Sequence, residues 1–196
     1  MASKEKMLQK KKDILNALKR LLDKYSYSYI SMQSVADEAG ISKGGLRYHF
    51  PTKESLFIGL LEDFFMSIED EHLKMVSLLD EKGDRAVIST LFNIESFVLS
   101  QKNIKVFINL ILYSLEVPKM MVFVKSFFRK HLEMYKQIIE QGKSDFPKID
   151  KKEFDLEFLA RITQIIFISA GLLETIDPIK MEPQKLTRYV LSLFSE

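Results

Sequence analysis

Residues 31–56 of the chain read SMQSVADEAGISKGGLRYHFPTKESL, and this stretch decides the fold. Its apolar spacing predicts two short helices, over residues 32–39 and 43–49. Ser31 and Ser42 stand just before these helices, where a serine hydroxyl accepts a hydrogen bond from a free backbone N–H group. Gly40 ends the first helix, and we expect it to take the positive φ that a tight turn needs. Pro51 ends the second helix, because proline disfavours helical geometry in the residue before it.

Three further residues indicate how these two helices pack. Ala36 is small at the point where the helices have to cross closely, and Ile41 and Leu46 are spaced to close the core between them. Two short helices joined by a glycine turn form a helix-turn-helix, whose second helix enters the major groove of DNA. The sequence therefore predicts a DNA-binding motif.

Helical periodicity continues on both sides of this motif, and Gly (7) and Pro (5) are scarce. We predict an all-α fold of about nine helices, without strands. Besides the two short helices, the expected helices cover residues 3–24, 53–79, 83–101, 105–117, 119–141, 154–176 and 183–194.

The charge of the chain is unevenly distributed. Residues 1–53 hold eleven basic and five acidic residues, a net charge of +6, whereas the remainder holds 18 basic and 22 acidic residues, a net charge of −4. A basic N-terminal part on an acidic body indicates a polyanion-binding head joined to a body with another task.

The same stretch resembles the DNA-binding segment of the TetR family of bacterial transcriptional regulators. The matching elements are VAxxAGISKG at residues 35–44 and YHFPTKExL at residues 48–56. The resemblance implies an N-terminal three-helix DNA-binding domain at residues 1–51 and a helical ligand-binding and dimerisation domain at residues 52–196. It also implies a homodimer on a palindromic operator.

Two positions depart from the family pattern. Gly45 stands where relatives usually carry Ser or Thr, and Arg47 stands where they usually carry an aromatic residue. Gly45 lacks a hydroxyl that would contact phosphate or base, and Arg47 adds a cation that reaches either. The DNA contacts of relatives are therefore not transferable to these two positions.

A helical wheel with Leu46 inward places Tyr48 on the opposite face, with Gly44 and Gly45 on the same side. Lys53 and the N-terminal lysines are expected to contact phosphates. For Tyr48 the structural alternative is packing against the first helix, and for the lysines it is a solvated face. The predicted DNA contacts are Ser31, Gln33, Ser42, Lys43, Gly44, Gly45, Arg47, Tyr48, His49, Lys53, Lys4 and Lys6.

The body is rich in Phe (15 in the whole chain) and Met (9). Apolar pockets occur between the helices of bundles, so a small lipophilic ligand is one interpretation and an ordinary core is the other. The candidate ligand contacts are Glu95, Phe92, Phe107, Tyr113, Phe127, Arg161 and Ile165. Small residues of 154–176 and the apolar stripe of 183–194 predict a dimer interface formed by these two helices.

Glu95 and Arg161 lie on otherwise apolar helical stripes. A charge buried in such a place has to be paired or has to serve a ligand. Three alternatives remain open from the sequence: the two residues pair with each other, bind a ligand, or lie at a subunit interface.

These features predict a DNA-binding transcriptional regulator, expected to be a repressor that a lipophilic ligand releases from its operator. The alternative is a DNA-binding protein of the same fold with a chromosome-organising role. An enzyme is not expected, because no nucleophile–base pair, phosphate-binding loop or dinucleotide motif is present. No cofactor or metal site is expected, since the chain has no Cys and its three His are far apart in sequence. The most apolar windows run only 12 residues, so we expect a cytoplasmic protein without a membrane span.

Overall fold

A computed structural model describes residues 2–77, 82–142, 155–182, 185–186 and 189. The described residues contain eight α-helices and no strand, which confirms the all-α prediction. The α-helices are α1 (Ala2–Lys24), α2 (Met32–Glu38), α3 (Lys43–His49), α4 (Lys53–Ser77), α5 (Lys82–Asn93), α6 (Gln101–Glu116), α7 (Pro118–Gly142) and α8 (Leu156–Ile176). A 3-10 turn (Tyr27–Tyr29) follows α1, and a π-helical segment (Ile94–Leu99) follows α5.

The helix predicted over residues 83–101 is therefore interrupted, because its second half winds as the π-helical segment. The ninth helix, predicted over residues 183–194, lies largely outside the described residues. Residues 143–154, which include the start of the helix predicted over 154–176, lie outside them as well.

The chain forms two compact units, and both draw on distant parts of the sequence. The first unit comprises residues 1–66 and 105–124, and the second comprises residues 67–104 and 125–196. The boundary predicted at residues 51–52 differs from this division, because the first part of α4 and most of α6 pack with the N-terminal helices. α4 contributes to both units.

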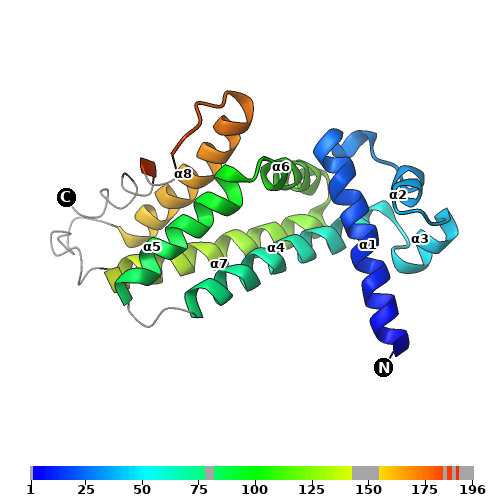
Figure 1. The fold of residues 1–196 in the computed structure, drawn as a ribbon, viewed down its shortest axis with the longest axis horizontal. Helices are drawn as coiled ribbons and strands as arrows, with labels where there is room; N and C mark the ends of the chain where they lie inside the picture. The colour runs from blue at the N-terminus through cyan, green and yellow to red at the C-terminus, as the bar shows by residue number, and fades with distance from the viewer. Residues whose placement is uncertain (1, 78–81, 143–154, 183–184, 187–188, 190–196) are drawn as a thin grey trace. The chain divides into compact units, whose positions relative to one another are not determined.

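The first unit is built around the helix-turn-helix (Figure 1, blue to cyan). α1 buries one face, with Ile14, Leu18 and Leu22 at most 1% exposed. Val35 and Ala36 of α2 and Leu46 of α3 are completely buried. The three helices thus enclose a single small core, as the apolar spacing predicts.

The close approach of α3 to α4 depends on Gly59. A Cβ built at Gly59 would lie 2.7 Å from a ring carbon of Phe50, which is closer than real Cβ contacts allow. Phe50 follows α3 directly and is 7% exposed. A glycine in α4 therefore lets the Phe50 ring pack on the backbone of the helix.

The second unit packs α5, the π-helical segment, α8 and the later parts of α4 and α7. One of its core clusters contains Ile94, Leu132, Tyr135, Ile139, Ala160, Phe167 and Ala170. Ala160, Ala170 and Gly171 of α8 are buried on its inner face. These small residues allow close packing inside the unit, and the dimer interface predicted for this helix stays a prediction.

Among the described helices, α8 alone is long and apolar enough to span a membrane by length and composition, with a mean hydropathy of 1.6 over 18 residues. The 12-residue window noted in the sequence lies within this longer helix. Core helices of helical bundles reach the same length and hydropathy. α8 also buries Gln164, whose Nε2 donates to the backbone oxygen of Phe128 at 2.9 Å.

Candidate nucleic-acid interface

Both helices of the helix-turn-helix begin with a serine cap. Ser31 Oγ accepts from the N–H group of Ser34 at 3.0 Å, and Ser34 Oγ lies 2.9 Å from the N–H group of Ser31, which donates to it. Ser42 Oγ accepts from the N–H group of Gly45 at 3.0 Å. The predicted caps are confirmed, and they hold the start of each helix in a fixed position.

The turn between the two helices depends on a single left-handed residue. Gly40 has φ +64°, as predicted, and the N–H group of Ile41 donates to the backbone oxygen of Ala36 at 3.0 Å. Residues with a Cβ adopt this conformation at a cost, so glycine suits the position. The turn sets the angle at which α3 leaves α2.

α3 presents the face that the helical wheel predicts. Leu46 is completely buried, whereas Tyr48 is 77% exposed, and Lys43, Gly44 and Arg47 are also exposed. Gln33 of α2 is exposed too, and its Nε2 donates to Asp37 at 2.7 Å. The outward face of α3 thus carries an aromatic ring, two cations and an open stretch of backbone, which are groups that reach bases and phosphates in a groove.

His49 differs from the other predicted contacts because it is only half-exposed. Its ring stands edge-on to Tyr48, with the ring centroids 5.1 Å apart. Its Nδ1 is buried and has no hydrogen-bond partner in the part of the chain that the structure describes. The imidazole therefore supports the ring of Tyr48 from the side.

α1 carries the predicted lysines on its exposed side. Lys6, Lys10 and Lys12 are exposed, and Lys11 lies with Nζ 5.8 Å from the centroid of the Phe50 ring. The side chain of Lys4 lies outside the described residues. Exposed ammonium groups bind the phosphates of the DNA backbone whatever the base sequence, so these lysines would contribute affinity but not sequence specificity.

Lys53 is not oriented as the sequence predicts. Its Nζ donates to the backbone oxygen of Tyr27 at 2.8 Å and lies 5.6 Å from the ring centroids of both Phe57 and Tyr113. Desolvation lowers the pKa of this ammonium group, and nearby Glu116 opposes the effect. The side chain is thus directed into the first unit, and this orientation does not support the expected phosphate contact.

Lys53 belongs to a polar cluster that joins the first unit together, which we call the Tyr27 cluster: Tyr27, Lys53, Phe57, Asn109, Tyr113 and Glu116. The N–H group of Tyr27 donates to Asn109 Oδ1 at 2.8 Å, and the Tyr27 hydroxyl donates to Glu116. Through these bonds the turn after α1 is fixed to α4 and α6. The spacing of these residues in the sequence gives no signal for this cluster.

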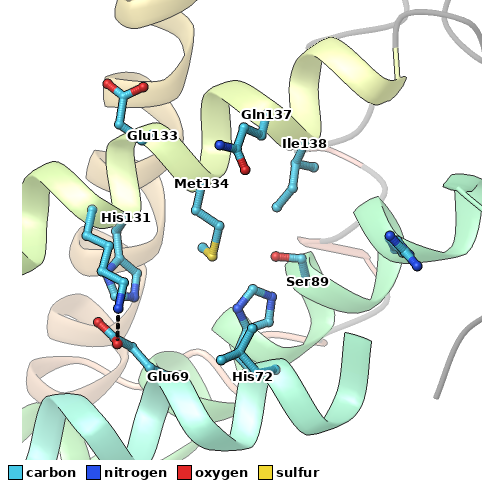
Figure 2. Close-up of a pocket in the computed structure, with 11 residues that line it drawn as sticks. Glu69, His72, Ser89, His131, Glu133, Met134, Gln137 and Ile138 are labelled. Atoms are coloured by element: carbon cyan, nitrogen blue, oxygen red, sulfur yellow. Dashed lines mark hydrogen bonds and ion pairs between the residues drawn. The ribbon is translucent and has the colours of Figure 1, made fainter. Parts of the chain in front are cut away.

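A pocket of about 420 Å³ lies in the second unit, between α4, α5 and α7. It is lined by Glu69, His72, Leu73, Arg85, Ser89, Lys130, His131, Glu133, Met134, Gln137 and Ile138. In Figure 2, Met134 and Ile138 of α7 point toward His72 of α4 and Ser89 of α5 across the same space. Its volume falls in the range of small-molecule sites.

None of the seven predicted ligand contacts lines this pocket. Phe92 lies beside it, because its ring stacks on that of His72 at 5.4 Å, and the Phe127 ring lies 3.9 Å from that of His131. Phe107 and Tyr113 are in the first unit, where they contact Phe64 and Phe57. Glu95, Arg161 and Ile165 are exposed.

Glu95 and Arg161 are both exposed, so the expectation that they are buried charges on apolar helical faces is wrong. Arg161 donates to Gln164 Oε1 at 2.8 Å and lies on the outer face of α8. The apolar stripe around it is exposed as well: Phe158 (61%), Ile165 (50%), Leu172 (37%), Leu173 (60%) and Ile176 (70%). We call this set the α8 stripe. The sequence leaves three roles open for Glu95 and Arg161: a mutual ion pair, ligand binding or a place at a subunit interface. For Arg161, the exposed α8 stripe around it favours the subunit interface.

Burial lowers the pKa of both His72 and His131. For His131, the hydrogen bond between Nδ1 and the Phe127 oxygen, at 3.1 Å, partly opposes this effect. Because a backbone oxygen only accepts, Nδ1 carries the proton, and Nε2 of the neutral ring is an acceptor. Both imidazoles are therefore neutral at physiological pH.

We expect the free energy of unfolding to fall as the pH is lowered from 7 to 5. As the pH falls through about 6.5, the ordinary histidine pKa, these histidines take up protons in the unfolded chain but not yet in the folded protein. The stabilisation is therefore complete above about pH 6.5, and it is lost as the pH falls toward the lowered pKa values of the folded protein. Each histidine contributes a slope of up to about 1.4 kcal/mol per pH unit. Urea denaturation across this range measures the slope, and His72→Phe should flatten it. An unchanged slope in that variant would contradict the assignment.

Gly44→Ala should have opposite effects on folding and on DNA binding. A Cβ at Gly44 would meet only Ser42 Oγ, at 3.9 Å, and alanine favours a helix by about 1 kcal/mol over glycine. We therefore expect a higher melting temperature and weaker DNA binding, because the methyl group occupies the exposed face of α3. Thermal unfolding and a DNA titration of the same sample measure both effects. Unchanged DNA affinity would show that DNA does not approach this backbone.

The geometry of α2 and α3 defines a helix-turn-helix DNA-binding protein. Residues 14–60 match the sequence model of the bacterial regulatory proteins of the tetR family. Residues 14–60 therefore form a DNA-binding domain of the tetR family type.

Three comparisons place the chain among known proteins. It is 37% identical over 84 residues to the nucleoid occlusion factor SlmA of Shewanella amazonensis. These matched residues are 42% of this chain and 40% of that protein. The chain thus spans less than half the length of the curated relatives it matches. Two solved structures share the fold. A putative transcriptional regulator from Pseudomonas aeruginosa PAO1 has a TM-score of 0.80 and 13% identity, and the match covers 94% of this chain and 88% of that one. A putative transcriptional regulator from Saccharomonospora viridis in complex with choline has a TM-score of 0.79 and 16% identity, and the match covers 93% of this chain and 94% of that one.

Proposed function

We propose that this protein is a cytoplasmic repressor that binds a palindromic operator as a homodimer and leaves it when a small ligand enters the pocket of the second unit. The observation that carries the DNA-binding part is the outward face of α3, with Tyr48 exposed opposite the buried Leu46. Dimerisation and ligand release rest on the α8 stripe and on the pocket.

The α8 stripe supports the proposed dimer. Its five large apolar residues are between 37% and 70% exposed in the single chain, and contiguous apolar surface of this kind marks an interaction site. Two copies related by a two-fold axis would cover the stripe with itself. A two-fold dimer also carries two copies of α3, as recognition of two successive major grooves roughly 34–36 Å apart requires.

Ligand release is supported by the course of α4. This helix begins at Lys53, in the Tyr27 cluster, and later contributes Glu69 and His72 to the pocket. We infer that α4 can adopt two positions, one that permits DNA binding and one that does not. A ligand that binds more tightly to the second conformation shifts the equilibrium toward it. By linkage, it must then bind the DNA-free protein more tightly, by the factor by which it weakens DNA binding.

A second function is favoured by one comparison, the match to a nucleoid occlusion factor over 42% of the chain. In that case the same DNA-binding domain would serve a chromosome-organising role. Both functions need the DNA-binding domain, so the choice rests on where the protein binds.

Chromatin immunoprecipitation with sequencing of the full chain separates these functions. A repressor should occupy a few inverted repeats in promoters, including DNA flanking its own gene, and its deletion should raise transcription of the adjacent genes. Many dispersed sites without a change in transcription would support the chromosome-organising role. An absence of sequence-specific sites would contradict both.

A further inference from the structure

Two residues of the pocket lining carry polar atoms that lack partners among the described residues. His72 Nε2 and Ser89 Oγ are buried and have no hydrogen-bond partner among the described residues. The two side chains are 9% and 1% exposed, and Figure 2 shows both directed toward the space that Met134 and Ile138 face. Buried polar groups are normally paired, so an orphaned pair beside a cavity indicates a missing partner.

The charged residues around the pocket are largely paired with one another. Lys130 forms an ion pair with Glu69, and Lys136 binds Glu133 at 3.0 Å. Figure 2 shows Glu133 pointing away from the space between α4 and α7. Arg85 is the remaining charged residue of the lining, and it is exposed. A charged group placed beside His72 and Ser89 would therefore find no unpaired, buried counter-charge among the described residues.

We propose that the pocket selects an uncharged amphipathic molecule, such as an alcohol or a primary amide, whose polar head binds His72 Nε2 and Ser89 Oγ. Its apolar tail lies against Leu73, Met134 and Ile138. This inference rests on the proposed ligand-binding role of the second unit and names the chemistry of the ligand. The volume of about 420 Å³ suits a compact molecule.

The neutrality of the two imidazoles fits this head group. Since His72 and His131 are uncharged at physiological pH, they offer one donor or acceptor per ring nitrogen and no net charge. A hydroxyl or an amide both donates and accepts, so it matches a serine hydroxyl and an imidazole together. A carboxylate only accepts, and a quaternary ammonium group does neither.

Isothermal titration calorimetry of the full chain without DNA tests the proposal with four probes of equal chain length: 1-octanol, octanamide, octanoate and octyltrimethylammonium. We expect the alcohol and the amide to bind more tightly than the two ions. Tighter binding of either ion, or no binding of the alcohol and the amide, would overturn the proposal.

Two variants test the contacts. Ser89→Ala removes the hydroxyl, and His72→Phe removes both ring nitrogens but keeps an aromatic ring, so each should weaken 1-octanol binding by about threefold to tenfold. Val122→Ala is the control, because Val122 is exposed on α7 outside the pocket lining, and this variant should leave 1-octanol binding unchanged. Unchanged affinity in both polar variants, with folding intact by circular dichroism, would overturn the assignment of the head group.

A separate readout tests the proposed function itself. If 1-octanol binds as expected but leaves operator affinity unchanged, ligand release is wrong and the head-group assignment stands. If operator affinity falls while the four probes show no preference, ligand release stands and the head-group assignment is wrong.

Discussion

Tyr48→Ala is expected to weaken binding to the operator by about 1–3 kcal/mol, roughly fivefold to 150-fold, and to change binding to random DNA little. The reason is that the ring is 77% exposed on the outer face of α3 while Leu46 below it stays buried. Removing the ring therefore costs a contact to DNA and leaves the core intact. Fluorescence anisotropy with operator and scrambled duplexes measures the difference.

Lys6→Ala is the matched control for this experiment. Lys6 is exposed on α1, and a lysine that contacts phosphate should contribute equally to both duplexes. We expect a uniform, smaller loss. If Tyr48→Ala weakens both duplexes equally, Tyr48 does not read the sequence, and recognition must depend on Arg47, Gln33 or the shape of the DNA.

Ile165→Arg should convert the proposed homodimer into monomers. Ile165 is half-exposed in the single chain, so the substitution leaves the core of the unit unchanged. In a two-fold interface it introduces two unpaired charges, and an uncompensated buried charge costs about 3–5 kcal/mol. We expect a monomer by sedimentation velocity, and operator binding weaker by at least a hundredfold.

Val122→Arg provides the control for the dimer experiment. Val122 is an apolar residue of α7 that is 67% exposed, so the variant adds the same charge at a comparable surface position outside the α8 stripe. It should sediment like the unmodified protein. A dimer that persists in Ile165→Arg would show that α8 does not form the interface.

Much of the first unit is predictable from the sequence, because local signals determine it. Ser31, Gly40 and Ser42 each act within a few residues of their own position, and the positions of Leu46 and Tyr48 follow from helical periodicity alone. The orientation of Lys53 is not predictable in this way, because its partners, Tyr27 and Tyr113, come from distant segments that periodicity does not relate.

The pocket was not predicted, although a signal for it exists. His72 continues the buried stripe of Leu61, Phe65 and Ile68 on α4, and His131 continues that of Val124 and Phe127 on α7. A histidine on an apolar stripe marks a polar group carried into the interior. The wide separation of His72 and His131 in the sequence gives no sign that both line one pocket. For Arg161 the sequence misleads in the opposite direction. An apolar helical stripe suggests burial, but the stripe that contains Arg161 is exposed on the outer face of α8.

The manner in which Lys53 is held has a consequence for work at high ionic strength. Contacts between exposed ammonium groups and DNA phosphates weaken steeply as salt is added, and the Debye length falls to about 3 Å at 1 M. Lys53 is bound by a backbone oxygen and two ring faces, and it is partly shielded from solvent, so screening affects it far less. Salt should therefore release the protein from DNA while the link between the turn after α1 and α4 persists. DNA-free protein prepared in this way would keep the folded geometry of its DNA-binding unit.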